Sequence, residues 1–240
     1  MGYSGGIGTS ELVDLLLSFV VLTVAFSMVG NGSIFGGGSG LLNSLTPNNL
    51  IVIGVAVGTG FLLHELAHKF VAQRYGYRAE YKASMFGLIL TVVMALTIGI
   101  VFAAPGAVMI RKASYSTPQS TYGYSESDDA YWDHIEKKIG NEDLWISLAG
   151  PMTNIILTAF FFTLITMMVN GMLTNYLDIA VTAFRINLML AAFNLIPIDP
   201  LDGGKIFRGN ALMWMVVGVP TILFALYVLF AGGLPLIFFR

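Results

Sequence analysis

The sequence contains no cysteine and few charged residues. Of its 240 residues, 56% are hydrophobic and only 11% are charged, whereas an average soluble domain carries about 25% charged residues. The absence of cysteine excludes disulfides, thiolate metal sites and cysteine nucleophiles. The low charge excludes an ordinary soluble domain, and no basic patch indicates nucleic-acid binding. We therefore expect an integral multi-pass protein whose partner is the lipid bilayer, and any metal site must rely on His, Asp and Glu.

Long apolar runs predict five full transmembrane helices. One run begins near residue 49, and the others are residues 15–29, 144–174, 179–198 and 211–230. A crossing helix needs about 20 apolar residues, which these runs supply together with their flanks. We expect an all-α polytopic membrane protein in which residues 1–240 form a single domain, with a polar loop at residues 111–143.

Two histidines and a glutamate interrupt the second apolar run, as His64-Glu65-Leu-Ala-His68. On a helix, His64 and His68 lie one turn apart on the same face, so both imidazoles can bind one ion at ~2.0–2.1 Å. Glu65 is turned about 100° from His64, which suits a general base beside the metal. Ionisable groups at membrane depth are costly and usually serve function. We interpret the motif as half of a zinc site.

The other half is expected where the fourth run ends. Pro197 breaks the helix, and Gly203 lets the chain bend tightly after Asp202. Two histidines and one carboxylate form a hydrolytic zinc set. Asp202 is the first candidate for the third ligand, and Asp199 is the alternative.

Four further positions stand out in the apolar helices. Asn194 offers an amide that can polarise a carbonyl or stabilise an oxyanion. Gly150, Pro151 and Asn154 are explained by helix packing, with Pro151 suited to a first helical turn and Asn154 committed to a buried interface.

The loop after the first motif predicts its orientation. Lys69, Arg74, Arg78 and Lys82 follow the histidines, with Glu80 the single acid among them. Short basic loops beside a span are typical of the cytoplasmic side. We expect the active site near the cytoplasmic leaflet.

The apolar run at residues 85–101 is predicted to be re-entrant. If it crossed the membrane, Asp202 would finish on the opposite side from His64 and His68. The separation would be on the order of 20 Å, too far for a shared ion.

Residues 100–110 allow two interpretations. Pro105 and Gly106 form a turn signal between short apolar runs, which favours an edge strand or a short membrane-associated β-hairpin. Such an edge can pair with an extended peptide, which makes Phe102, Pro105 and Gly106 candidate substrate-binding residues. The alternative is an ordinary helix that ends at Pro105.

These residues together resemble the site-2 protease family of intramembrane zinc metalloproteases. The matching motifs are His64-Glu65-x-x-His68, Gly150-Pro151-x-x-Asn154, Asn194-x-x-Pro197 and Leu201-Asp202-Gly203. The resemblance covers about residues 50–205, and the pairing of the first motif with the last is specific where either alone is weak.

The resemblance implies a metalloendopeptidase with one zinc ion per chain. His64, His68 and Asp202 would hold the zinc, Glu65 would be the base, and Asn194 would assist at the scissile carbonyl. The substrate would be a transmembrane helix of another protein, cut in or near the bilayer during regulated intramembrane proteolysis. The run at 85–101 and the loop at 111–143 depart from a compact form of the family.

Three alternative functions remain. A membrane zincin acting on non-transmembrane peptides would usually take a Glu ligand from a later helix, yet no glutamate follows Glu142. An ion or proton transporter would show paired broken helices in two related halves, and no such repeat is evident. A catalytically inactive binding protein is disfavoured because Glu65 and the three candidate ligands are all present. The sequence indicates no oligomeric state.

Overall fold

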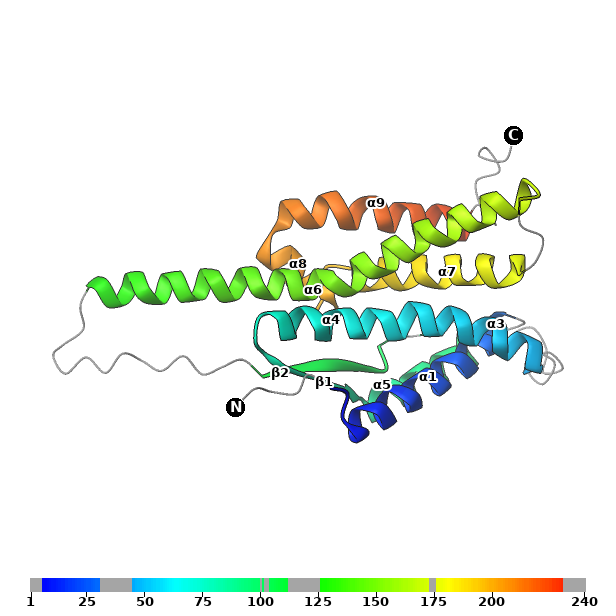
Figure 1. The fold of residues 1–240 in the computed structure, drawn as a ribbon, viewed down its shortest axis with the longest axis horizontal. Helices are drawn as coiled ribbons and strands as arrows, with labels where there is room; N and C mark the ends of the chain where they lie inside the picture. Colours follow the sequence, from blue (N-terminus) through cyan, green and yellow to red (C-terminus); the bar gives the residue numbers. More distant parts are fainter. Residues whose placement is uncertain are drawn as a thin grey trace.

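A computed structural model describes residues 6–30, 45–99, 101, 104–111, 126–172 and 176–230, with only the backbone for residues 30 and 126–139. Within these ranges the chain is mainly helical (Figure 1). The elements in chain order are α1 (Thr9–Gly30), α3 (Pro47–Val57), the π-helix η2 (Gly58–Leu62), α4 (Leu63–Arg74), β1 (Arg78–Ala83), α5 (Met85–Thr97), β2 (Gly106–Arg111), α6 (Glu126–Val169), α7 (Leu177–Asn194), α8 (Asp202–Gly209) and α9 (Ala211–Phe230).

In the part of the chain that the structure describes, five helical stretches are long and apolar enough to cross a membrane, which confirms the expected five. They are Thr9–Val29, Pro47–Arg74, Gly140–Val169, Leu177–Asn194 and Ala211–Phe230. The second is a 28-residue rod in which α3, η2 and α4 follow one another without a break. The His64-Glu65-x-x-His68 motif therefore lies on a long apolar helix.

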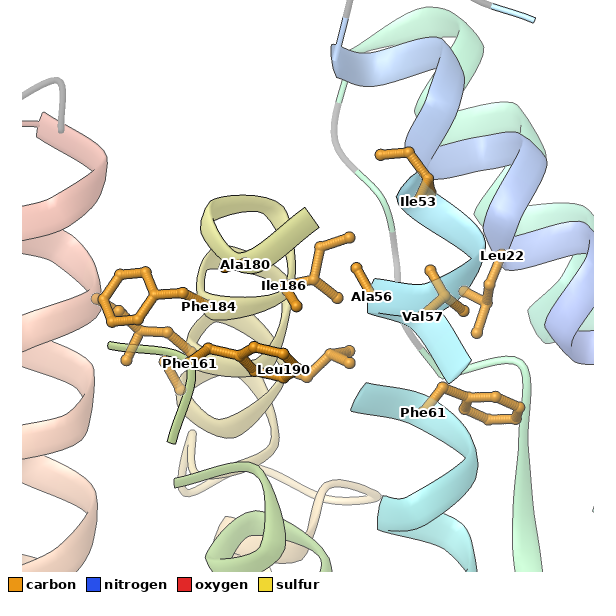
Figure 2. Packing of buried hydrophobic residues seen from close by; sticks show 14 of the residues in the cluster. Leu22, Ile53, Ala56, Val57, Phe61, Phe161, Ala180, Phe184, Ile186 and Leu190 are labelled. Atoms are coloured by element: carbon orange, nitrogen blue, oxygen red, sulfur yellow. The ribbon is translucent and has the colours of Figure 1, made fainter. Parts of the chain in front are cut away.

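The main hydrophobic core surrounds α7, which packs against α3, α6 and α9. In Figure 2, Phe184 of α7 points toward α9, while Ile186 faces Ala56 in the space between α7 and α3. On the far side of α3, Val57 faces Leu22 of α1. Burial of these apolar side chains fixes α7 between the other helices and so fixes the position of its C-terminal end.

The apolar run that was expected to be re-entrant begins and ends at the same place. Ala83, the last residue of β1, is the register partner of Gly106, the first residue of β2. The backbone N–H of Ser84 donates to the carbonyl of Pro105 at 2.7 Å. Helix α5 between them has 13 residues, about 20 Å of rise, which is short of a ~30 Å hydrocarbon core. The described ends of this run therefore meet at one place, as expected of a re-entrant segment and not of a crossing helix.

The expected β-structure is present, but its partner strand is different. We expected Pro105-Gly106 to turn between two local strands, whereas β2 pairs antiparallel with β1, on the other side of α5. Gly106 is required by this pairing, because a Cβ there would lie 2.3 Å from the carbonyl oxygen of Lys82. Phe102 lies outside the described residues.

The outer edge of β1 is covered by acidic side chains of α1. The N–H groups of Tyr81 and Ala83 donate to Glu11 Oε1 at 3.0 Å and Asp14 Oδ2 at 3.3 Å. The other oxygen of Glu11 accepts from Lys69 Nζ at 2.5 Å, and both of these side chains are buried. Backbone groups without water need such partners. Helix α1 thus takes the place of a third strand.

Helix α6 corrects two expectations. Residues 126–143, which we expected in a polar loop, form its N-terminal part, which extends beyond the other helices in Figure 1. Pro151 consequently lies inside the helix and not in its first turn. Proline has no N–H for the preceding turn and tends to kink a helix, and Figure 1 shows α6 changing direction partway along.

Because the chain has no cysteine, single-cysteine variants can test the path of residues 84–105. Tyr75, Arg111 and Asn48 are all exposed. With a membrane-impermeant thiol reagent, Tyr75→Cys and Arg111→Cys should be labelled from the same side of the membrane, because Arg78 and Arg111 are register partners. Asn48→Cys, at the other end of the 28-residue rod, should be labelled from the opposite side. Labelling of Arg111→Cys together with Asn48→Cys would show that residues 84–105 cross.

Candidate metal centre

Three side chains from distant parts of the chain converge between α4 and α8. The Nε2 atoms of His64 and His68 lie 3.1 Å apart, and Asp202 Oδ2 lies 3.4 Å from the first and 3.0 Å from the second. All three residues are buried. Among the residues with described side chains, they form a cluster able to hold a metal ion.

The spacing of these atoms fits zinc. Tetrahedral bonds of 2.0–2.1 Å place neighbouring ligand atoms about 3.3 Å apart. The three observed separations lie between 3.0 and 3.4 Å. Two imidazoles and one carboxylate are also a ligand set that leaves a fourth position open for water or substrate. The three residues predicted from the sequence are therefore brought together in a zinc-compatible triangle.

Gly150 of α6 leaves the space that this triangle needs. A Cβ at Gly150 would lie 2.3 Å from His68 Nε2 and 2.5 Å from His64 Nε2. A methyl group there would occupy the side of the imidazoles from which an ion is bound. The sequence interpretation assigned Gly150 to helix packing, and the structure gives it a second task at the metal centre.

The same face of α6 also contacts the outer nitrogens of both imidazoles. His68 Nδ1 lies 2.6 Å from the carbonyl oxygen of Ile146, and His64 Nδ1 lies 3.1 Å from Asn154 Nδ2. Ile146, Gly150 and Asn154 are successive fourth residues and so share one helix face. Because His64 and His68 are also four residues apart on α4, each imidazole contacts a different turn of this α6 face.

Asp202 is placed by the start of α8. It is the first residue of that short helix, and Gly203 after it packs so closely that a Cβ would lie 2.3 Å from the carbonyl oxygen of Leu195. The glycine is thus explained by close backbone approach. Oδ1 of Asp202 faces Lys205 Nζ at 3.7 Å, which leaves Oδ2 for the histidines. Burial alone would raise the pKa of Asp202, but the imidazoles of His68 and His64 hold it well below its usual range.

The alternative ligand, Asp199, is directed elsewhere. It is exposed, and its Oδ1 accepts from Arg208 Nη2 at 2.9 Å while Oδ2 pairs with Nη1. These hydrogen bonds lower the pKa of Asp199. Its carboxylate is therefore engaged in a surface ion pair, away from the two histidines.

Glu65 is half-buried beside the triangle and has no hydrogen-bond or ion-pair partner among the described residues. A carboxylate that is not engaged by the protein is available to accept a proton. Asn194, in contrast, donates from Nδ2 to the carbonyl of Leu190 one turn back in α7. Pro197 follows in the bend that leads from α7 to α8.

Sequence reasoning missed three contacts of this site. The carbonyl of Ile146 is a backbone group that no sequence signal identifies. Lys205 could have been found from its i,i+3 spacing to Asp202. Asn154 was noticed as a polar residue in an apolar helix, but its contact with His64 was not anticipated.

Comparisons with known proteins agree with this site. The sequence matches the family described as Peptidase family M50 over residues 52–184 and 169–238. It is 36% identical over 224 residues, or 92% of this chain and 95% of the relative, to "Putative zinc metalloprotease MJ0611" of Methanocaldococcus jannaschii. "Zinc metalloprotease MJ0392" of the same organism is 27% identical over 82% of this chain and 41% of its own length. No solved structure matches the chain significantly.

Gly150→Ala should lower zinc affinity, because the added methyl group would lie against both Nε2 atoms. We expect a loss of at least the 10–100-fold that follows from disturbing the surroundings of a metal ligand. Gly140→Ala is the matched control on the same helix, since a Cβ there meets nothing within 4 Å. Competition with a zinc chelator measures both variants. Equal affinities for the two would remove Gly150 from the metal centre.

Substitution of the two aspartates separates the candidate third ligands. Asp202→Ala should reduce bound zinc by more than about tenfold, because it removes a ligand atom from the triangle. Asp199→Ala should leave the zinc content unchanged, because Asp199 pairs with Arg208 on the surface. Metal analysis of the purified variants is the measurement. The reverse pattern would transfer the ligand role to Asp199.

Proposed function

Because the chain belongs to peptidase family M50, the site-2 protease family, we propose that it cleaves peptide bonds in or near the transmembrane segments of membrane proteins. The chain is a zinc metalloprotease and, with five long apolar helices among its described residues, an integral membrane protein. The observation that carries the proposal is the buried triangle of His64, His68 and Asp202 inside an apolar helical bundle. A site there suits substrates that are themselves within the membrane. Such cleavage is a step of regulated intramembrane proteolysis.

The depth of the motif in its span supports this substrate class. At 1.5 Å per residue, His64 lies about 26 Å along the helix from Pro47 and about 15 Å from Arg74. The basic residues that follow, including Arg74, Arg78 and Lys82, favour a cytoplasmic location for the nearer end. We propose that the site opens toward the cytoplasmic leaflet, from which water would enter.

In the proposed mechanism, His64, His68 and Asp202 would hold the zinc. When bound there, zinc supplies Lewis-acid chemistry, lowering the pKa of water and polarising a carbonyl. Glu65 accepts the proton of the attacking water and later delivers it to the leaving amine. Asn194, at the end of α7, would turn its amide toward the scissile carbonyl. Its Nδ2 carries two protons, of which one donates to the carbonyl of Leu190 and the other is left for this role.

The edge of β2 supports the proposed way of holding a substrate. The outer edge of β1 is occupied by Glu11 and Asp14, whereas no described strand pairs with the outer edge of β2. An unwound substrate segment could therefore add to β2 by strand addition. Pro105 and Gly106 stand at the start of this strand, and they remain our candidates for substrate contact together with Phe102.

Glu65→Gln tests the chemistry. The variant should keep its zinc, because the ligand atoms are unchanged, and should lose roughly 10²–10⁴-fold in cleavage rate, the usual contribution of a general acid–base. Asp178→Asn, an exposed acid in the first turn of α7, is the control and should cleave normally. Undiminished cleavage by Glu65→Gln would exclude Glu65 as the base.

The same assay tests the substrate class. Purified protein in proteoliposomes is given a single-span membrane substrate, and the same segment is also supplied as a peptide made soluble by flanking charges. We expect chelator-sensitive cleavage of the membrane form alone. Preferential cleavage of the soluble peptide would favour the alternative, a membrane zincin that acts on non-transmembrane peptides.

A further inference from the structure

Asn154 of α6 is the buried side chain that faces the outer nitrogen of His64. It is completely inaccessible to solvent, and its Nδ2 lies 3.1 Å from His64 Nδ1. Its Oδ1 is also buried and has no hydrogen-bond partner among the described residues. Buried polar atoms are rarely left without a partner in folded proteins. In this orientation, therefore, the Nδ2 end of the amide has a hydrogen-bond partner and the Oδ1 end has none among the described residues.

The chemistry of imidazole makes the choice of amide atom important. A neutral imidazole carries one proton, so one nitrogen donates and the other accepts. A metal takes the lone pair of Nε2, and then Nδ1 must carry the proton and donate it to an acceptor. For His68 the carbonyl of Ile146 is that acceptor. For His64 the group in the corresponding place is the amide of Asn154.

We propose that Asn154 is a positioning residue that sets the tautomer of His64 by accepting a hydrogen bond from Nδ1 through Oδ1. A half-turn of the amide exchanges Oδ1 and Nδ2, so that Oδ1 faces Nδ1 of His64 and the Nε2 lone pair is left for the metal. In the other orientation, Nδ2 donates to Nδ1, and the proton resides on Nε2, which faces Asp202 Oδ2 at 3.4 Å. His64 then cannot act as a ligand. The amide orientation and metal binding are therefore coupled.

This proposal rests on the assignment of His64 as a zinc ligand, and two substitutions at Asn154 test it. Asn154→Leu keeps the size of the side chain but offers no acceptor, and we expect zinc affinity to fall 10–100-fold. Asn154→Asp offers an oxygen in either orientation, and we expect affinity within about threefold of the unmodified protein. Affinity is measured by competition with a zinc chelator, so the readout does not depend on activity.

Asn187 provides the matched control for the loss of a buried amide. It is equally inaccessible, its Oδ1 is likewise without a partner among the described residues, and its Nδ2 donates to the carbonyl of Ala183. Asn187→Leu should therefore leave zinc affinity unchanged even if it lowers thermal stability. A loss of affinity as large as that of Asn154→Leu would indicate a general packing effect and would overturn the proposal.

Asn154→Asp decides between the two hydrogen-bond directions without relying on Asn154→Leu to fold. If the zinc affinity of Asn154→Asp falls as far as the 10–100-fold loss expected of Asn154→Leu, an acceptor at this position is not what His64 needs, and the proposal is overturned. His64→Ala tests separately the assumption that His64 is a zinc ligand. If His64→Ala binds zinc normally, the assignment of His64 as a ligand is wrong. If only that variant loses zinc while Asn154→Leu does not, the tautomer role alone is wrong.

Discussion

The close packing of α4 against α6 at Gly150 is the constraint on which the metal centre depends. Without a side chain at this position, the backbone of α6 comes within contact distance of both Nε2 atoms, and the carbonyl of Ile146 and the amide of Asn154 reach the two Nδ1 atoms. In an apolar bundle, each of these buried polar groups needs a partner. One helix face therefore supplies both the space for an ion and the hydrogen bonds that orient two of its candidate ligands. A seam between two rigid helices holds such groups more accurately than loops do.

A second requirement arises because a small β-sheet is packed among membrane helices. Strand edges carry unpaired N–H and C=O groups, which are costly where water is absent. On β1 the side chains of Glu11 and Asp14 satisfy this need, and the buried pair of Glu11 with Lys69 ties the same helix to α4, one residue after His68. The two edges of the sheet thus differ in whether an additional strand can pair with them. This asymmetry, and not the presence of a sheet alone, is what would direct an extended substrate to β2.

Much of the fold and of the candidate site could be predicted because local rules determine it. Apolar run length predicts the five spans, and helical spacing places His64 and His68 on one face. Other features depend on partners far away in the chain. β1 was interpreted as a basic loop because Arg78, Glu80 and Lys82 are charged, whereas its alternate residues become buried only through pairing with β2, which lies beyond α5 in the chain. The N-terminal part of α6 was taken for a loop because its composition is polar. The carbonyl of Ile146 carries no side-chain signal at all.

The π-helix η2 explains how one continuous helical stretch can pack against two different sets of neighbours. Before it, α3 packs on α1 and α7; after it, α4 packs on α6 and the sheet. A π turn takes up one extra residue, and one residue corresponds to about 100° of helix rotation. The extra residue thus turns the histidine face toward α6 while the apolar face of α3 stays on α7. Gly60 lies in this turn close to α7, where a Cβ would lie 2.8 Å from Leu190 Cδ1. The irregular turn directly before the histidine motif is therefore part of what brings the motif to α6 and Asp202.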